Sequence, residues 1–127
     1  MKEILLVALG GALGSVARYE LSGWVVHRLV DWKFPTGTFA VNVLGCLFAG
    51  FVAGIAEKYD WLSPEARIFL LTGIAGGFTT FSAFGVETMF LLRRGETLVA
   101  ASYVAASIAF GLVALWIGLS AVITRSS

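Results

Sequence analysis

Charged residues are scarce in this chain. Only 13% of its 127 residues are Asp, Glu, Lys or Arg, and nine basic against eight acidic residues leave a net charge of +1. Hydrophobic residues make up 58% of the chain, and the mean hydropathy is +0.89. A soluble domain of this length has too much surface for that balance. The composition therefore excludes an ordinary soluble domain, and we expect no nucleic-acid partner.

Residues that build metal sites and disulfides are also scarce. The single cysteine, Cys46, excludes both a disulfide framework and a cysteine metal site within one chain. The single histidine, His27, is expected to be an interfacial residue rather than a ligand. The common nucleotide-binding motif G-x-x-x-x-G-K-[ST] is missing. We therefore expect neither an enzyme nor a nucleotide-binding protein.

Long uncharged runs are what the sequence has instead. Three of them, 37–56, 68–86 and 97–124, contain 20, 19 and 28 residues, and about 18 apolar residues suffice to cross a bilayer. A fourth run starts at Ile4 and continues past Arg18, and we expect it to be a retained helix rather than a cleaved signal. The sequence predicts one all-α domain over 1–127 that lies in the lipid bilayer, with four transmembrane helices at roughly 4–29, 37–57, 66–92 and 97–123.

The basic residues do not define an orientation in the membrane. Short loops require neighbouring helices to run antiparallel, so the termini and the second loop share one side. Four basic residues then fall on each side: Lys2, Lys58, Arg67 and Arg125 against Arg28, Lys33, Arg93 and Arg94. Either one loop dominates and the orientation is unique, or the chain inserts both ways. The second alternative gives an antiparallel homodimer about a two-fold axis in the membrane plane.

Three pairs of glycines at a spacing of four indicate close helix packing. They are Gly10 with Gly14, Gly50 with Gly54, and Gly73 with Gly77. Such pairs let helix backbones approach each other in lipid. Together they predict tight packing in an oligomer.

Several polar side chains lie at bilayer depth, where each needs a partner or a function. Asn42, with Thr38 one turn earlier, either bonds another helix or lines a passage. Tyr103 and Ser107 share a face with Gly111, as a packing seam or as a row of donors suited to an anion. Arg18 either extends its charge to the membrane surface or lies at a water-filled vestibule.

The stretch "GIAGGFTTFSAF", residues 73–84, combines three glycines with two threonines inside the third uncharged run. This composition predicts a helix broken near its middle. Broken helices in membranes line cavities or coordinate ions, and freed carbonyls suit a hard cation such as sodium. Phe81 and Phe84 follow on one helical face. They either pack in the core or offer their positively polarised ring edges to an anion.

The chain resembles the Fluc (CrcB) family of fluoride channels. The motifs are "GGALGSVAR", "GTFAVNVLG" and "GGFTTFSAFGVE", followed by the "RRG" turn and the helix of Tyr103. They occur in the family's order over essentially the whole chain. Two positions depart from the family pattern. Ala83 stands where threonine is common, and Gly111 stands where some relatives keep a hydroxyl.

The resemblance implies dual-topology homodimers with two fluoride pores and a structural sodium ion on the central axis. It assigns the backbone carbonyls of Gly76 and Thr79 to sodium, and Arg18 and Glu87 to a vestibule or pore mouth. It assigns to the fluoride path the residues Thr38, Asn42, Thr80, Phe81, Ser82, Phe84, Tyr103 and Ser107. The implied function is passive export of cytoplasmic fluoride across a prokaryotic plasma or inner membrane, which protects the cell against fluoride toxicity.

Two other functional classes remain open on the residues alone. A small proton-coupled multidrug exporter is also a compact dual-topology dimer, but it needs an embedded carboxylate, for which Glu20 and Glu87 are the candidates. A non-transporting assembly factor would need only the glycine pairs. Neither explains a broken third helix.

Overall fold

The computed structural model describes residues 1–29 and 33–126, and every regular element within them is helical. Four helical spans are long and apolar enough to cross a membrane, as in a multi-pass membrane protein: Lys2–Arg28, Thr36–Lys58, Pro64–Arg93 and Thr97–Ile123. The bounds predicted from the sequence lie within two residues of these ends. The number and type of the helices are therefore confirmed.

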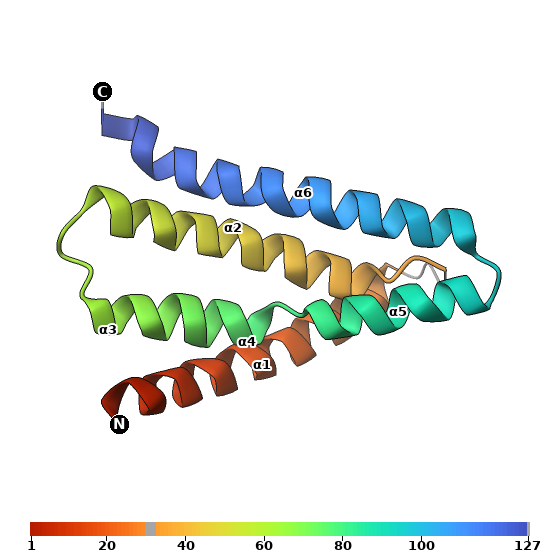
Figure 1. The fold of residues 1–127 in the computed structure, drawn as a ribbon, viewed down its shortest axis with the longest axis horizontal. Coiled ribbons are helices and arrows are strands. Elements are labelled where there is room, and N and C mark those ends of the chain that lie inside the picture. The colour runs from red at the N-terminus through yellow and green to blue at the C-terminus, as the bar shows by residue number, and fades with distance from the viewer. Residues whose placement is uncertain (30–32, 127) are drawn as a thin grey trace.

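The spans alternate in direction along the chain (Figure 1). Helices α1 (Lys2–Arg28), α2 (Thr36–Lys58) and α6 (Thr97–Ile123) are continuous. Both chain ends lie at the same end of the molecule as the turn that leaves α2 (Figure 1). Helices α2 and α6 consequently run parallel to each other.

The third span is assembled from separate pieces. It contains α3 (Pro64–Arg67), a π-helical segment η1 (Ile68–Ala75), α4 (Gly76–Phe78) and α5 (Phe81–Arg93). Thr79 and Thr80 between α4 and α5 are extended, with φ and ψ of −91° and 155°, and of −146° and 120°. The predicted break near the middle of this span is confirmed.

The break lies at the threonines, whereas the glycines of the same stretch are helical. A Cβ atom at Gly10 would lie 2.9 Å from the Cα of Gly73. A Cβ atom at Gly77 would lie 3.0 Å from the Cα of Gly11. These glycines therefore serve the close contact of α1 with the third span, since a methyl group at either position would meet backbone.

Glycines also set the contact of α2 with α6. Gly50 lies against Leu115 and Gly54 against Leu119, an offset of 65 in both cases. All three glycine pairs thus pack helices of the same chain. These contacts therefore do not support the expectation that the glycine pairs indicate an oligomer, because all three already bring helices of one chain together.

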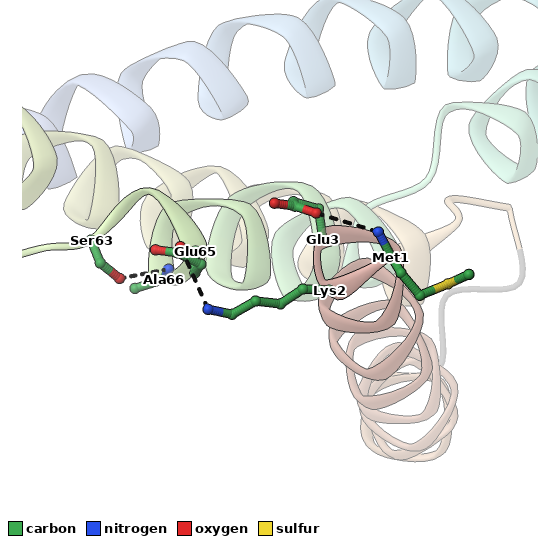
Figure 2. Close-up of polar contacts among 6 residues, drawn as sticks. All are labelled: Met1, Lys2, Glu3, Ser63, Glu65 and Ala66. Atoms are coloured by element: carbon green, nitrogen blue, oxygen red, sulfur yellow. Dashed lines mark hydrogen bonds and ion pairs between the residues drawn. The ribbon is translucent and has the colours of Figure 1, made fainter.

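Local signals define the start of the third span. The Ser63 hydroxyl accepts a hydrogen bond from the Ala66 amide at 3.1 Å (Figure 2). Pro64 occupies the first helical turn. Lys2 Nζ lies 3.6 Å from Glu65 Oε1, which ties the start of α1 to the start of α3 (Figure 2). This ion pair is exposed and screened by solvent, so it contributes little to stability.

Candidate functional site

The break in the third span is bound by the side chain of Asn42 on α2. Asn42 Nδ2 donates to the Thr80 carbonyl at 2.9 Å, and the Thr80 amide donates to Asn42 Oδ1 at 2.7 Å. The Asn42 side chain thus satisfies both backbone polar groups of Thr80, which has left the helix. Of the two alternatives for Asn42, a bond to another helix is confirmed.

These bonds leave two carbonyls without their helical partners. The Thr80 amide donates to Asn42, so it does not close a helical bond to the carbonyl of Gly76. The Ala83 amide donates to Thr80 Oγ1 at 3.1 Å, so it does not close one to the carbonyl of Thr79. Oxygen atoms of this kind are ligands for hard cations. Among the described residues no three acidic, histidine or cysteine side chains gather as a metal site. The assignment of the Gly76 and Thr79 carbonyls to sodium stays a prediction.

Arg18 contacts the same break from α1. Its Nε donates to the Gly77 carbonyl at 3.1 Å, and Ser15 Oγ donates to the same oxygen at 3.4 Å. Arg18 therefore satisfies a carbonyl that the interrupted helix leaves open. It also lines a cavity of about 650 Å³ beside α1 together with Tyr19 and Glu20. Its place in a vestibule stays a prediction.

Glu87 on α5 lies between two buried donors. Thr38 Oγ1 donates to Oε1 at 2.6 Å, and the Tyr103 hydroxyl donates to Oε2 at 2.7 Å. Tyr103 is fully buried and Thr38 is 8% exposed. The carboxyl thus joins α2, α5 and α6 through two short hydrogen bonds. Its assignment to a pore mouth stays a prediction.

Three aromatic rings follow one another beside this group. The ring centroids of Phe81 and Phe84 are 5.7 Å apart, and those of Phe84 and Tyr103 are 5.1 Å apart. Phe81 is 85% exposed on the chain, whereas Phe84 packs against the core of Tyr103 and Leu91. One ring of the pair is therefore a packing residue, and the other is free to meet a ligand or a partner surface.

A cavity of about 280 Å³ lies against the break. It is lined by Asn42, Cys46, Thr79, Thr80, Phe81, Phe84, Ser107 and Ile108. The Ser107 hydroxyl is buried and has no hydrogen-bond partner in the described part of the chain. An unpaired buried hydroxyl is costly, which makes it a candidate contact for a ligand in this cavity.

The structure brings most of the predicted path residues together. Thr38 and Tyr103 meet at Glu87, next to the cavity and outside its lining. Ser82 is exposed and lies 3.3 Å from Thr80 Oγ1, also outside the lining. The predicted path residues that line the cavity are Asn42, Thr80, Phe81, Phe84 and Ser107, and Thr79, predicted for the sodium site, lines it as well.

Two residues that contribute to the site were not predicted from the sequence. Ser15 contacts the break, and Cys46 lines the cavity. Cys46 follows Thr38 and Asn42 at the same spacing of four, so this helical periodicity was the available signal.

Residues 5–119 match the family described as CrcB-like protein, Camphor Resistance (CrcB). The chain belongs to this family. A relative from Methylobacillus flagellatus, named fluoride-specific ion channel FluC, is 53% identical over 96% of this CrcB chain and 95% of its own length. Relatives of the same name from Nitratidesulfovibrio vulgaris and Flavobacterium psychrophilum are 50% and 46% identical over 94% of this chain and 95% of their own lengths. These CrcB relatives carry the names of ion channels, a class of proteins that are not enzymes.

Proposed function

We propose that this chain is a fluoride-specific passive ion channel. The relatives' names support the ion, and the cavity at the helix break supports the path. The observation that carries the proposal is the lining of this cavity, where amide, hydroxyl and ring-edge groups meet and no charged side chain is among the described lining residues. The broken third span is explained by this function and by neither of the two alternatives from the sequence.

The cavity lining suits a small anion that must enter and leave quickly. The unpartnered Ser107 hydroxyl and the second N–H of Asn42 replace water as donors to fluoride. The edges of Phe81 and Phe84 add a weak attraction for negative charge. A fixed cation in the lining would hold the anion instead, so its absence from the described lining favours conduction.

Fluoride export follows from the chemistry of hydrogen fluoride. The neutral acid crosses lipid and dissociates in a neutral cytoplasm, where the anion is trapped. An open path lets the inside-negative potential drive the anion outward, at about 2.3 kcal/mol per charge per 100 mV. The protein would act in the plasma or inner membrane and protect the cell from fluoride toxicity.

The functional unit in this proposal is an antiparallel homodimer of the single domain 1–127 with a sodium ion on its axis. One chain offers the carbonyls of Gly76 and Thr79, and a second copy related by a two-fold axis would double that number. Hard cations take about six oxygen ligands, so carbonyls from two chains approach that number and those of one chain do not. The ion would supply positive charge that fixes the carbonyls at the break.

Purified protein in liposomes loaded with fluoride or with chloride tests the proposal. We expect efflux of fluoride without chloride, in the absence of any proton gradient. Chloride efflux at an equal rate, or a strict requirement for a proton gradient, contradicts it.

Asn42→Asp tests the site itself. Aspartate keeps the acceptor for the Thr80 amide but loses the donor to the Thr80 carbonyl and adds a charge at bilayer depth. We expect fluoride efflux to fall by about tenfold or more, which corresponds to about 1.4 kcal/mol in the barrier. The control is Thr36→Val, which removes an exposed 3.3 Å hydrogen bond from the first residue of α2 to the Leu29 carbonyl at the end of α1. Equal rates in the two variants would remove Asn42 from the path.

A further inference from the structure

Helices α2 and α6 present two polar stripes to each other in register. The offset of 65 set by the glycines at 50 and 54 pairs Thr38 with Tyr103 and Asn42 with Ser107. Thr38 and Tyr103 both donate to Glu87. Asn42 and Ser107 both line the 280 Å³ cavity. Each pair therefore contributes polar groups from both helices to the same level of the site.

The next pair in this register is Cys46 with Gly111. A Cβ atom at Gly111 would lie 3.5 Å from the Cys46 Sγ, which is an ordinary contact distance. Helix α6 thus has no side chain at this level, and the thiol from α2 occupies the space opposite. Cys46 also lines the cavity directly and is neither fully buried nor in a disulfide.

A second observation in the same cavity points to a ligand. The buried Ser107 hydroxyl has no partner within the described residues, and it lies one helical turn before Gly111. A species that accepts the Ser107 hydrogen bond would reach the level of the thiol within one turn of the helix.

We propose that the Cys46 thiol is the third polar group of the fluoride path in this chain, standing on α2 at the level where α6 has only Gly111. The inference rests on the proposed function. A thiol is a weak hydrogen-bond donor, so it takes the place of a hydroxyl on α6 without holding the anion tightly. The same placement makes Cys46 a site at which a small thiol reagent closes the path.

Modification by methyl methanethiosulfonate tests the placement. The Cys46 thiol loses its proton to water, and its sulfur attacks the sulfenyl sulfur of the reagent. A disulfide forms, and methanesulfinate leaves with the electron pair of the broken sulfur–sulfur bond. The product replaces the S–H donor with an apolar methylthio group in the cavity. Because Cys46 is the only cysteine in the sequence, one adduct per chain in an intact mass spectrum reports this site alone.

We expect the labelled protein in liposomes to lose fluoride efflux by about tenfold or more and to recover it with dithiothreitol. Cys46→Ser has no thiol, so the reagent leaves that variant's own rate unchanged. A protein that is fully labelled without slowing, or that is never labelled, overturns the inference. If the unmodified protein releases no fluoride, the proposed function fails.

Labelling rates give a readout that does not depend on flux. Fluoride in the path should slow adduct formation at Cys46, whereas chloride at the same concentration should not. Equal labelling rates in the two salts would show that the thiol lies away from the fluoride path.

Moving the polar group from Cys46 on α2 to position 111 on α6 separates the effect of its hydrogen bonding from the effect of its volume. Cys46→Ala is expected to conduct about 3- to 10-fold more slowly than Cys46→Ser, the effect of one lost donor. In the Cys46→Ala background, Gly111→Ser returns a hydroxyl to this level, and Gly111→Ala returns only the volume. We expect faster efflux with Gly111→Ser than with Gly111→Ala, and equal rates would overturn the polar role of this level.

Discussion

Glu87 combines a structural contact with a position beside the proposed fluoride path. Its two carboxylate oxygens accept from Thr38 and Tyr103, so it connects three helices at one point. A buried donor that loses its partner costs more than an average hydrogen bond contributes. The group is therefore expected to hold α2, α5 and α6 in register as well as to set the shape of the path.

Tyr103→Phe measures this contact. The variant removes the bond to Glu87 and leaves one carboxylate oxygen without its donor, at a cost of about 1 to 3 kcal/mol. We expect a lower melting temperature for the purified protein in detergent. The matched control is Tyr59→Phe, because Tyr59 is 39% exposed. The same melting temperature in both variants would mean that the hydroxyl of Tyr103 is not held by Glu87.

Phe81 differs from Phe84 in what it does for the fold. An 85% exposed ring contributes little to the packing of the single chain, so it is available for a contact outside the chain. The proposed function supplies that contact as an anion at the edge of the ring.

Phe81→Ile is consequently expected to reduce fluoride efflux by about tenfold, or about 1.4 kcal/mol in the barrier, with an unchanged melting temperature. Isoleucine keeps an apolar side chain but has no polarised edge. Phe90→Ile on the same helix, where the ring is 51% exposed, serves as the control and should conduct normally. Normal efflux through the Phe81 variant would remove the ring from the path.

At the scale of elements, the third span separates two tasks that one stretch of sequence combines. Its first half packs against α1 through Gly73 and Gly77, and its second half carries the rings. The extended pair Thr79 and Thr80 lies between them. Thr79 donates back to the Ala75 carbonyl, and Thr80 bonds Asn42 on α2 and the Ala83 amide at the start of α5. A helix that packs tightly can therefore end inside the membrane with both backbone groups of Thr80 satisfied by Asn42, while the carbonyls of Gly76 and Thr79 lack helical partners.

Gly10→Ala tests the packing half. The added methyl group would lie 2.7 Å from the Phe69 carbonyl oxygen and 2.9 Å from the Cα of Gly73. Both neighbours are backbone, so no rotamer change relieves the clash, and we expect a loss of about 1 to 3 kcal/mol in stability. Gly11→Ala is the control, since its methyl group meets nothing within 4 Å. A helical alanine there should stabilise the protein by up to about 1 kcal/mol. Equal melting temperatures for the two variants would contradict the observed contact.

The elements were predictable where the signal is local. Uncharged runs gave the four spans to within two residues at each end, and Ser63 with Pro64 marks a helix start. The stretch 73–84 predicts the break but not which of its residues leave the helix, because glycine serves both flexible backbone and close packing, and composition does not separate these uses. The register of α2 against α6 is set by the contacts of Gly50 and Gly54 on α2 with the carbonyls of Leu115 and Leu119 on α6. For that reason the position of Cys46 opposite Gly111 could not be read from spacing within one helix.

At the scale of the whole molecule, the distribution of basic residues does not favour one orientation of the chain in the membrane. Four basic side chains lie near each end of the bundle, and both termini lie at the same end (Figure 1). The excess of Lys and Arg that retains loops in the cytoplasm is therefore missing, and small changes in charge should decide the orientation. An antiparallel dimer needs both orientations in one membrane.

Paired charge variants test this requirement. Arg93→Ala with Arg94→Ala leaves Arg28 and Lys33 at one end against four basic residues at the other, so this chain should insert with its termini in the cytoplasm. Lys2→Ala with Arg125→Ala leaves Lys58 and Arg67 against four and should insert the opposite way. We expect each double variant alone to lose fluoride export from cells, and co-expression to restore it because the two orientations are then supplied by two chains. Full export by either variant alone would contradict the antiparallel dimer. Loss of both proteins from the membrane fraction would show misfolding instead, which an immunoblot of each strain detects.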